Sequence, residues 1–214
     1  MSAISIPTPA PGHFLVLEGV DWELYESVRQ ETDDAGNHVR ITYDNGRMVL
    51  MSPSRKHEWV HARIGRMIEM ATFEWDMAVY SLASSTWKRR DLAKALEADE
   101  CYYIQNEPKV RGRDDIDLVR DPPPDLVVEV DLTTSSREKE TIYAALGVNE
   151  IWRFDGKRTA FLKLRGRQYR SIEESEALPP IAPADIDRHL AMFQTMNETA
   201  IFREFAKWVR SIKK

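Results

Sequence analysis

The sequence predicts an α/β domain with a mixed β-sheet flanked by helices, and three observations favour this class. Residues 54–75 carry apolar side chains at helical spacing, which indicates a long amphipathic helix. Asn45-Gly46 separates two short runs of strand formers, as in an antiparallel hairpin. Residues 121–156 read as strand, helix and strand, the alternation that is typical of an α/β fold.

The N-terminal half begins with a Pro-rich stretch, residues 1–14, which we expect to be a flexible lead before a single domain of residues 15–214. Residues 18–34 mix polar and apolar side chains at helical spacing, and residues 37–53 contain the hairpin. The helix of residues 54–75 has one apolar stripe, made of Val60, Ile64, Met67, Ile68 and Ala71. This stripe is expected to pack on the core.

The C-terminal half is predicted as alternating short elements. Residues 77–91 read as two strands or one bent strand, and residues 95–105 as one strand rich in strand formers. Residues 121–131 form a strand bounded by prolines, and Ser135 to Glu138 is a capping box that starts a helix ending at Gly147. Three strands, 148–156, 158–166 and 167–175, and two helices, 183–194 and 198–214, complete the prediction.

Composition limits the class of protein. The chain has 214 residues, 43% of them hydrophobic, which suffices for one substantial core, and it has no apolar run of membrane-spanning length. Residues 1–14 have neither the basic nor the apolar region of an export signal, so we expect a cytoplasmic protein, and the single cysteine, Cys101, which cannot form an internal disulfide, agrees with this. A net charge of −5 gives no overall attraction to nucleic acid, and any such binding requires a local basic surface.

The string KHEWVH at residues 56–61 contains the H-E-x-x-H pattern of zinc peptidases. On a helix, His57 and His61 share a face, with Glu58 placed to activate water. A peptidase also needs a third ligand, and no downstream histidine pattern supplies one. In the other interpretation, Glu58 favours the positive helix N-terminus and both histidines are solvated or half-buried. A zinc peptidase therefore remains an alternative function.

Carboxylates gather in the middle of the chain. Alternation along a strand places Asp125, Glu129 and Asp131 on one face of residues 121–131. Glu97 and Asp99 share a face of the strand that comes before it. Because buried carboxylates need positive partners, two such neighbouring strands predict a hard-oxygen site for Mg²⁺ or Mn²⁺.

Lys139 provides a cation close to these acids. At helical spacing it shares a face with Ile142, Tyr143 and Leu146, the apolar stripe that must pack on the sheet. A lysine that points inward here suits both charge balance and catalysis. In the alternative interpretation, Lys139 extends outward to solvent and Asp131 caps the turn.

The sequence resembles the Uma2-like (DUF820) endonuclease family, a branch of the PD-(D/E)XK nuclease superfamily, between Tyr43 and Tyr169. The segments that carry the resemblance are DNGRMVLMSPSRKH, LEADECYYI and PPPDLVVEVDLTTSSREKETIYAALGVNEIWRFDG, of which the third is the most specific. The resemblance implies a restriction-endonuclease-like core, in which a helix precedes a three-stranded hairpin sheet that is followed by a second helix and a further strand.

The resemblance also implies roles for single residues. Asp99 resembles the first acid of the superfamily and Glu129 the second. Asp131 stands where the superfamily usually has lysine, and Lys139 on the next helix resembles a migrated lysine. Ala98 replaces the proline that close relatives tend to have before the first acid. Asp131 is expected to join Asp99 and Glu129 as a metal ligand.

Secondary site candidates are His57 and Glu58, which resemble the additional polar residue that many members direct at the metal. The implied activity is a Mg²⁺- or Mn²⁺-dependent endonuclease acting on nucleic acid, with DNA expected as the substrate and a homodimer expected by analogy. Basic residues must guide a phosphate backbone into an acidic site, and the first candidates are Lys88, Arg89 and Arg90, followed by Arg63, Arg66, Arg111 and Arg113. Because Asp131 replaces a lysine, a catalytically silent nucleic-acid-binding relative is a second alternative function.

Overall fold

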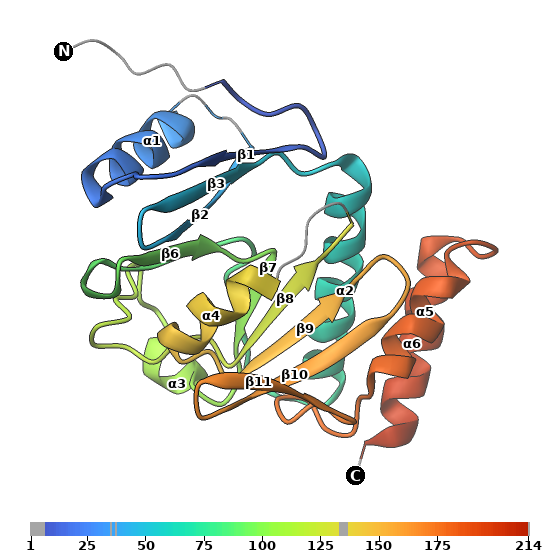
Figure 1. The fold of residues 1–214 in the computed structure, drawn as a ribbon. Coiled ribbons are helices and arrows are strands. Elements are labelled where there is room, and N and C mark those ends of the chain that lie inside the picture. The colour runs from blue at the N-terminus through green and yellow to red at the C-terminus, as the bar shows by residue number, and fades with distance from the viewer. Residues whose placement is uncertain (1–6, 35, 37, 133–136, 214) are drawn as a thin grey trace.

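A computed structural model describes residues 7–34, 36, 38–132 and 137–213 of the chain. The described residues form an α/β fold, as predicted from the sequence, with helices packed on β-sheets (Figure 1). The strands divide into two sheets, one of five strands and one of six, where the sequence predicted one mixed sheet. One apolar cluster packs on the smaller sheet and one on each face of the larger sheet, and the candidate site lies where the two sheets meet.

The smaller sheet is antiparallel and contains the predicted hairpin. Its strand order is β1-β3-β2-β6-β5, with bounds β1 (Phe14–Leu17), β2 (Arg40–Asp44), β3 (Arg47–Met51), β5 (Thr86–Arg89) and β6 (Lys94–Glu97). Asn45 and Gly46 both have positive φ, 48° and 93°, which a two-residue hairpin turn requires and these residue types tolerate. Helix α1 (Trp22–Asp34) packs Tyr25 and Val28 on one face of this sheet and leaves the other face for the site.

The larger sheet is mixed, because one of its strand pairs is parallel. Its order is β11-β10-β9-β8-β7-β4, with bounds β4 (Tyr80–Ser81), β7 (Glu100–Tyr103), β8 (Leu126–Val130), β9 (Glu150–Phe154), β10 (Thr159–Arg165) and β11 (Gln168–Ile172). Strands β8 and β9 run parallel, with Glu129 opposite Arg153. Helix α4 (Arg137–Leu146) lies in the crossover between them, as the strand, helix and strand pattern predicted.

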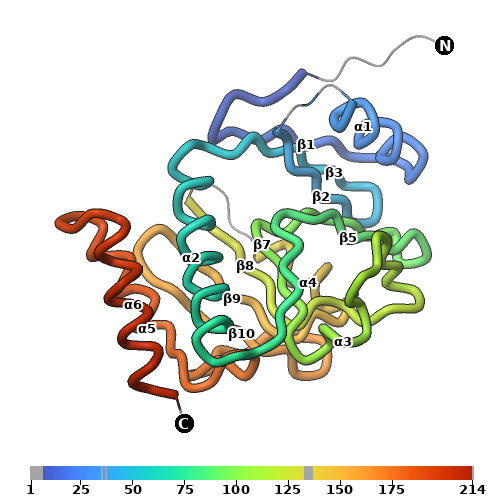
Figure 2. Tube along the Cα trace, turned by 180° about the vertical axis from the view of Figure 1, so that it is seen from behind, coloured from blue at the N-terminus to red at the C-terminus, as the bar shows by residue number. Residues whose placement is uncertain are grey.

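Helices cover both faces of the larger sheet. Helix α2 (Arg55–Glu74) packs its predicted apolar stripe on one face, together with α5 (Pro183–Met192) and α6 (Glu198–Ile212). Helix α4 covers the other face, and α3 (Glu107–Val110) joins it there through Val110. Figure 1 shows α4 in front of this sheet, whereas Figure 2, from behind, shows α2 in front. The N-terminus of α2 and the N-terminus of α4 thus approach β8 from opposite faces.

The prediction of one strand over residues 95–105 is wrong. Strand β6 ends at Glu97 in the smaller sheet, and β7 begins at Glu100 in the larger one. Ala98 and Asp99 form the link, because the chain crosses from one sheet to the other at this point. Residues 77–91 behave similarly: they form two strands, β4 and β5, in different sheets, and a 3₁₀ turn, η1 (Arg90–Leu92), follows.

The other predicted elements agree with the structure to within a few residues, whereas β1 and α3 were not predicted. The helix predicted before Gly147 ends at Leu146, and Gly147 has a φ of 82°, as expected of a glycine after a helix C-terminus. The predicted capping residue Ser135 lies outside the described residues. None of the helices in the described ranges combines the length and apolar character that a bilayer crossing requires.

Candidate active site

Asp99 lies in the link between the two sheets and is almost fully buried, with 1% of its surface exposed. Its Oδ2 accepts a hydrogen bond from the backbone nitrogen of Val130 at 2.7 Å, which ties it to the end of β8. Its Oδ1 accepts from Arg40 at 2.5 Å, and its Oδ2 is also 3.1 Å from His57 Nε2. The link between the sheets therefore places the Asp99 carboxylate against β8, the strand that carries Glu129.

Glu129 lies on β8 and is also buried, with 2% of its surface exposed. Lys139 Nζ on α4 lies 2.8 Å from Glu129 Oε2, so the predicted inward orientation of Lys139 is what the structure has. Tyr143, one helical turn later, donates a hydrogen bond from its hydroxyl to Glu129 Oε1. Both carboxylate oxygens of Glu129 thus have a partner on the same helix face.

The two acids influence each other electrostatically. Burial raises the pKa of Glu129 to about 7; Lys139 opposes this rise and the negative charge of Asp99 adds to it. Burial alone would raise the pKa of Asp99, but Arg40 and the hydrogen bond from His57 hold it well below its usual range. The pKa of Lys139 is raised because Glu129 and Asp99 outweigh its desolvation. Additional positive charge beside Glu129 would therefore be stabilising.

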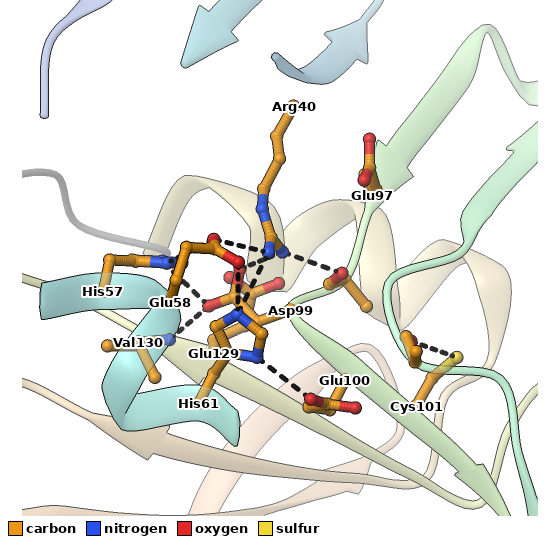
Figure 3. A network of polar contacts seen from close by, with 12 residues as sticks. Arg40, His57, Glu58, His61, Glu97, Asp99, Glu100, Cys101, Glu129 and Val130 are labelled. Atoms are coloured by element: carbon orange, nitrogen blue, oxygen red, sulfur yellow. Dashed lines mark hydrogen bonds and ion pairs between the residues drawn. The ribbon is translucent and has the colours of Figure 1, made fainter. Parts of the chain in front are cut away.

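Arg40, the first residue of β2, is a site residue that sequence reasoning missed. Its guanidinium donates to Asp99 Oδ1, to Ala98 O at 3.1 Å and to Glu58 Oε1 at 3.1 Å (Figure 3). Arg40 is 7% exposed, and its burial is offset by Asp99 and Glu58. The residue appeared in the sequence only as one polar position in a predicted hairpin, 59 residues from Asp99, and no local pattern could have paired the two.

Both histidines of the H-E-x-x-H string are buried, at 5% and 8% exposure, so the expectation that they are solvated or half-buried is wrong. They are buried because the N-terminus of α2 packs against the Asp99 link. His57 Nε2 contacts Asp99, and His61 Nδ1 lies 3.0 Å from Glu100 Oε1. His61 Nε2 lies 2.9 Å from Glu58 Oε2 (Figure 3). The two rings are therefore oriented by buried carboxylates.

These contacts set the charge of the helix N-terminus. Burial would lower the pKa of His61, but hydrogen bonds to Glu100 and Glu58 raise it to about 9. The pKa of His57 is raised in the same way by Asp99 and Glu58. The contacts of Glu58 with both histidines and with Arg40 hold the pKa of Glu58 far below its usual range. Without a bound cation, these contacts favour the protonated form of both imidazoles, whose charge balances part of the surrounding negative charge.

Two predicted acids do not join this network. Asp125 is at the other end of β8, where it accepts hydrogen bonds from Ile104 N at 2.7 Å, Asn106 N at 2.8 Å and Asn106 Nδ2 at 2.7 Å. These bonds fix the turn after β7. The prediction that Asp125 lies among the site carboxylates is wrong, because Asp125 precedes the five-residue strand β8 and the site lies at the other end of that strand. The side chain of Glu97 stands apart from the Asp99 contacts in Figure 3, and its backbone carbonyl lies 3.4 Å from Lys139 Nζ.

A cavity of about 730 Å³ opens onto this network. Glu129, Asp131 and Lys139 line it on one side, and Arg40 and His57 border it. The opposite wall is the free face of the smaller sheet, where cross-strand neighbours form rows: Phe14, Met51 and Arg40, then Val16, Val49 and Thr42, then Arg47 and Asp44. Asp131 is half-buried and lines the same cavity, two residues after Glu129.

The predicted guiding cations do not line this cavity. Lys88 pairs with Glu26 of α1 at 2.9 Å, Arg89 pairs with Asp91 at 2.6 Å, and Arg90 pairs with Glu23. The other candidates are also paired with acids, Arg63 and Arg66 with Glu198, Arg111 with Glu107 and Arg113 with Asp121. Arg47 on β3 does line the cavity, and it contacts Glu138 of α4 at 2.5 Å across its opening.

Comparison with known proteins assigns the family. The Uma2 family model, described as "Putative restriction endonuclease", matches residues 22–190. A solved structure described as "a putative nuclease belonging to DUF820" from Anabaena variabilis is similar in fold, with a TM-score of 0.48 and 13% identity; the match covers 69% of this chain and 89% of that one. Among curated proteins, none matches the chain. Because the family model spans most of the sequence, including the site just described, this chain belongs to the Uma2 family.

Proposed function

We propose that this chain is a Mg²⁺- or Mn²⁺-dependent endonuclease that hydrolyses phosphodiester bonds of nucleic acid, with DNA as its substrate. The observation that carries the proposal is the ion pair of Lys139 and Glu129, 2.8 Å apart, which lines the cavity and lies beside the buried Asp99. Two acids from neighbouring elements and one amine are the groups that metal-assisted hydrolysis needs. Family membership supports the same reaction class.

The residues present fit a hard divalent cation. Asp99 and Glu129 offer carboxylate oxygens, the donors that Mg²⁺ and Mn²⁺ prefer, and Asp131 offers a third at the edge of the cavity. Burial raises the pKa of Glu129 although Lys139 lies beside it, so a divalent cation would further stabilise its charged form. When bound, such an ion would lower the pKa of a coordinated water and neutralise charge on the phosphate.

The chain's own residues prepare the site for this chemistry. Lys139 presents Nζ beside Glu129, where it can hold the attacking water and offset negative charge that develops on the phosphate. Tyr143 fixes the second oxygen of Glu129. Arg40 and the backbone nitrogen of Val130 fix the two oxygens of Asp99. Because these partners lie on rigid helices and strands, the acids are held in place before substrate arrives.

The cavity supports a role for the smaller sheet in holding substrate. Its wall places apolar side chains, among them Val16 and Val49, next to Arg47. A nucleotide offers an apolar base and an anionic phosphate, so this wall can meet both parts. We therefore assign phosphate guidance to Arg47, in place of Lys88, Arg89 and Arg90. A homodimer would present two such sites to the two strands of a duplex.

Cleavage of supercoiled plasmid, single-stranded DNA and RNA tests this function. Wild-type protein with Mg²⁺ or Mn²⁺ should nick the plasmid, and EDTA should stop the reaction. Asp99→Asn and Glu129→Gln should each lose cleavage, whereas Asp91→Asn, which alters a surface acid paired with Arg89, should cleave like wild type. Nucleic-acid binding without cleavage in any metal would favour the silent relative instead, and cleavage of casein in Zn²⁺ would favour the peptidase.

A further inference from the structure

The two imidazoles at the start of α2 are arranged as metal ligands usually are. A histidine that binds a metal commonly donates its second ring nitrogen to a carboxylate, which fixes the ring. His57 Nε2 contacts Asp99 at 3.1 Å, and His61 Nδ1 contacts Glu100 at 3.0 Å. The remaining nitrogens, Nδ1 of His57 and Nε2 of His61, are thereby directed toward the carboxylate of Glu58.

One of these nitrogens lacks a hydrogen-bond partner among the described residues. His57 Nδ1 is buried without such a partner, and Glu58 Oε1 lies 3.5 Å from it. A buried polar atom without a partner costs free energy, and such atoms are rare in native proteins. The ligand atoms of His57, Glu58 and His61 all lie within 4.8 Å of one another. An ion among them would give His57 Nδ1 the partner it lacks.

We propose that His57, Glu58 and His61 form a transition-metal site, selective for Zn²⁺ over Mg²⁺, beside the acidic site of Asp99 and Glu129. Two imidazoles and one carboxylate are a donor set that suits Zn²⁺, whereas Mg²⁺ prefers oxygen donors. Three protein ligands leave a coordination position open for water. The ion would fix His57, which in turn holds Asp99, so that it acts on the neighbouring site by positioning.

Charge in this cluster also favours a divalent ion. Three carboxylates, those of Glu58, Asp99 and Glu100, contact the imidazoles or Arg40 in the described part of the chain. Arg40 is the one permanent cation in these contacts, so the rest of the charge balance falls to protons on the imidazoles, which a divalent ion would replace. Arg40 is also held by its hydrogen bonds to Asp99 and Ala98, which keep it in place when the ion binds.

This site differs from the peptidase site that the same string suggests. In a peptidase the glutamate of H-E-x-x-H activates water, and a third ligand comes from elsewhere in the chain. Here Glu58 contacts His61 directly and lies next to His57, so it is the third ligand itself. The nearby Glu100 is engaged by His61 Nδ1 and serves to orient the ring.

Calorimetric titration of the tag-free, full-length protein with Zn²⁺ alone and with Mg²⁺ alone tests the proposal. Wild type should bind one equivalent of Zn²⁺ at this site, and Mg²⁺ should not compete for it. His57→Gln, His61→Gln and Glu58→Gln should each weaken Zn²⁺ binding by at least about 10-fold. Glu58 is about half exposed, so Glu58→Gln is the variant least able to disturb folding, and circular dichroism checks all three.

Two controls separate this site from the acidic one. His38→Ala removes an exposed imidazole and should leave Zn²⁺ binding unchanged. Glu129→Gln should also keep the Zn²⁺ site; equal loss in Glu129→Gln would place the ion at the acidic site and overturn the proposal. Absence of Zn²⁺ binding in folded wild type, or wild-type binding by Glu58→Gln, would overturn it too. Zn²⁺ binding by a protein without nuclease activity would contradict the proposed nuclease function but would leave the zinc-site proposal standing.

Discussion

Lys139 Nζ lies 2.8 Å from Glu129 Oε2, although the two residues come from different elements and position 131, two residues after Glu129, is an aspartate. The lysine reaches the acid from the helix that follows β8, at a place where Tyr143 of the same helix contacts the other carboxylate oxygen. The amine therefore meets the acid from the following helix, although position 131 carries no lysine.

Replacing Lys139 should abolish most of the cleavage while the protein stays folded. In Lys139→Met the positive donor beside Glu129 is lost, and the cleavage rate should fall by about 100-fold or more. Plasmid nicking at saturating Mg²⁺ measures this. Lys109→Met, which removes an exposed lysine on α3, is the matched control and should cleave like wild type. Unchanged cleavage by Lys139→Met would remove Lys139 from the site.

Tyr143 should stabilise the fold through its bond to a carboxylate. Tyr143→Phe removes a hydrogen bond to a charged acceptor, which should lower the free energy of unfolding by about 1.5–3 kcal/mol. Tyr103→Phe removes a bond to the neutral carbonyl of Pro122 and should cost only about 0.5–1.5 kcal/mol. Urea unfolding in EDTA compares the two variants. Equal losses of unfolding free energy would show that the bond from Tyr143 to Glu129 is no stronger than a bond to a neutral carbonyl.

Arg40 should contribute more to stability than an exposed arginine of the same sheet. Arg40→Met leaves Asp99 buried without its cation, which should cost about 3–5 kcal/mol. Arg47→Met breaks a partly exposed pair with Glu138 and should cost less than about 1 kcal/mol. Chemical unfolding measures both. A loss in Arg40→Met as small as that in Arg47→Met would show that Asp99 finds another partner.

His189 should make the fold less stable in mild acid. Burial lowers the pKa of this histidine on α5 below 6.5, while a bond to the Asp185 carbonyl opposes the shift. Below pH 6.5 the unfolded chain therefore binds a proton at His189 more readily than the native chain does. The stability that the neutral, buried His189 contributes above pH 6.5 is thus lost as pH falls through the native pKa. Unfolding free energies at about pH 7.5 and pH 5 should differ more for wild type than for His189→Gln. An equal pH dependence in the two proteins would contradict this.

Local patterns in the sequence predict much of the core and part of the site. Alternation along β8 correctly separates Val127 from Leu126 and Val128, which pack on opposite faces of the sheet. Helical spacing correctly directs Lys139 inward together with Tyr143. These predictions succeed because each depends on the geometry of one strand or one helix.

Contacts between distant elements were beyond such patterns. Continuous strand propensity over residues 95–105 hid the crossover at Asp99, because propensity does not say which sheet a strand joins. Alternation along the strand predicted Asp125 on the same face as Glu129. In the structure, Asp125 lies at the other end of the strand and accepts hydrogen bonds from the turn after β7. The pairing of Arg40 with Asp99 depends on how the two sheets meet, which neither segment encodes alone.

Anomalous scattering from Mn²⁺ in crystals of the wild-type protein tests the acidic site most directly. A peak in contact with the carboxylates of Asp99 and Glu129, lost in Glu129→Gln crystals, is the predicted result. Crystals that hold Mn²⁺ elsewhere, with these two carboxylates still bound only to Arg40, Lys139 and their other protein partners, would contradict a metal-dependent hydrolase at this position.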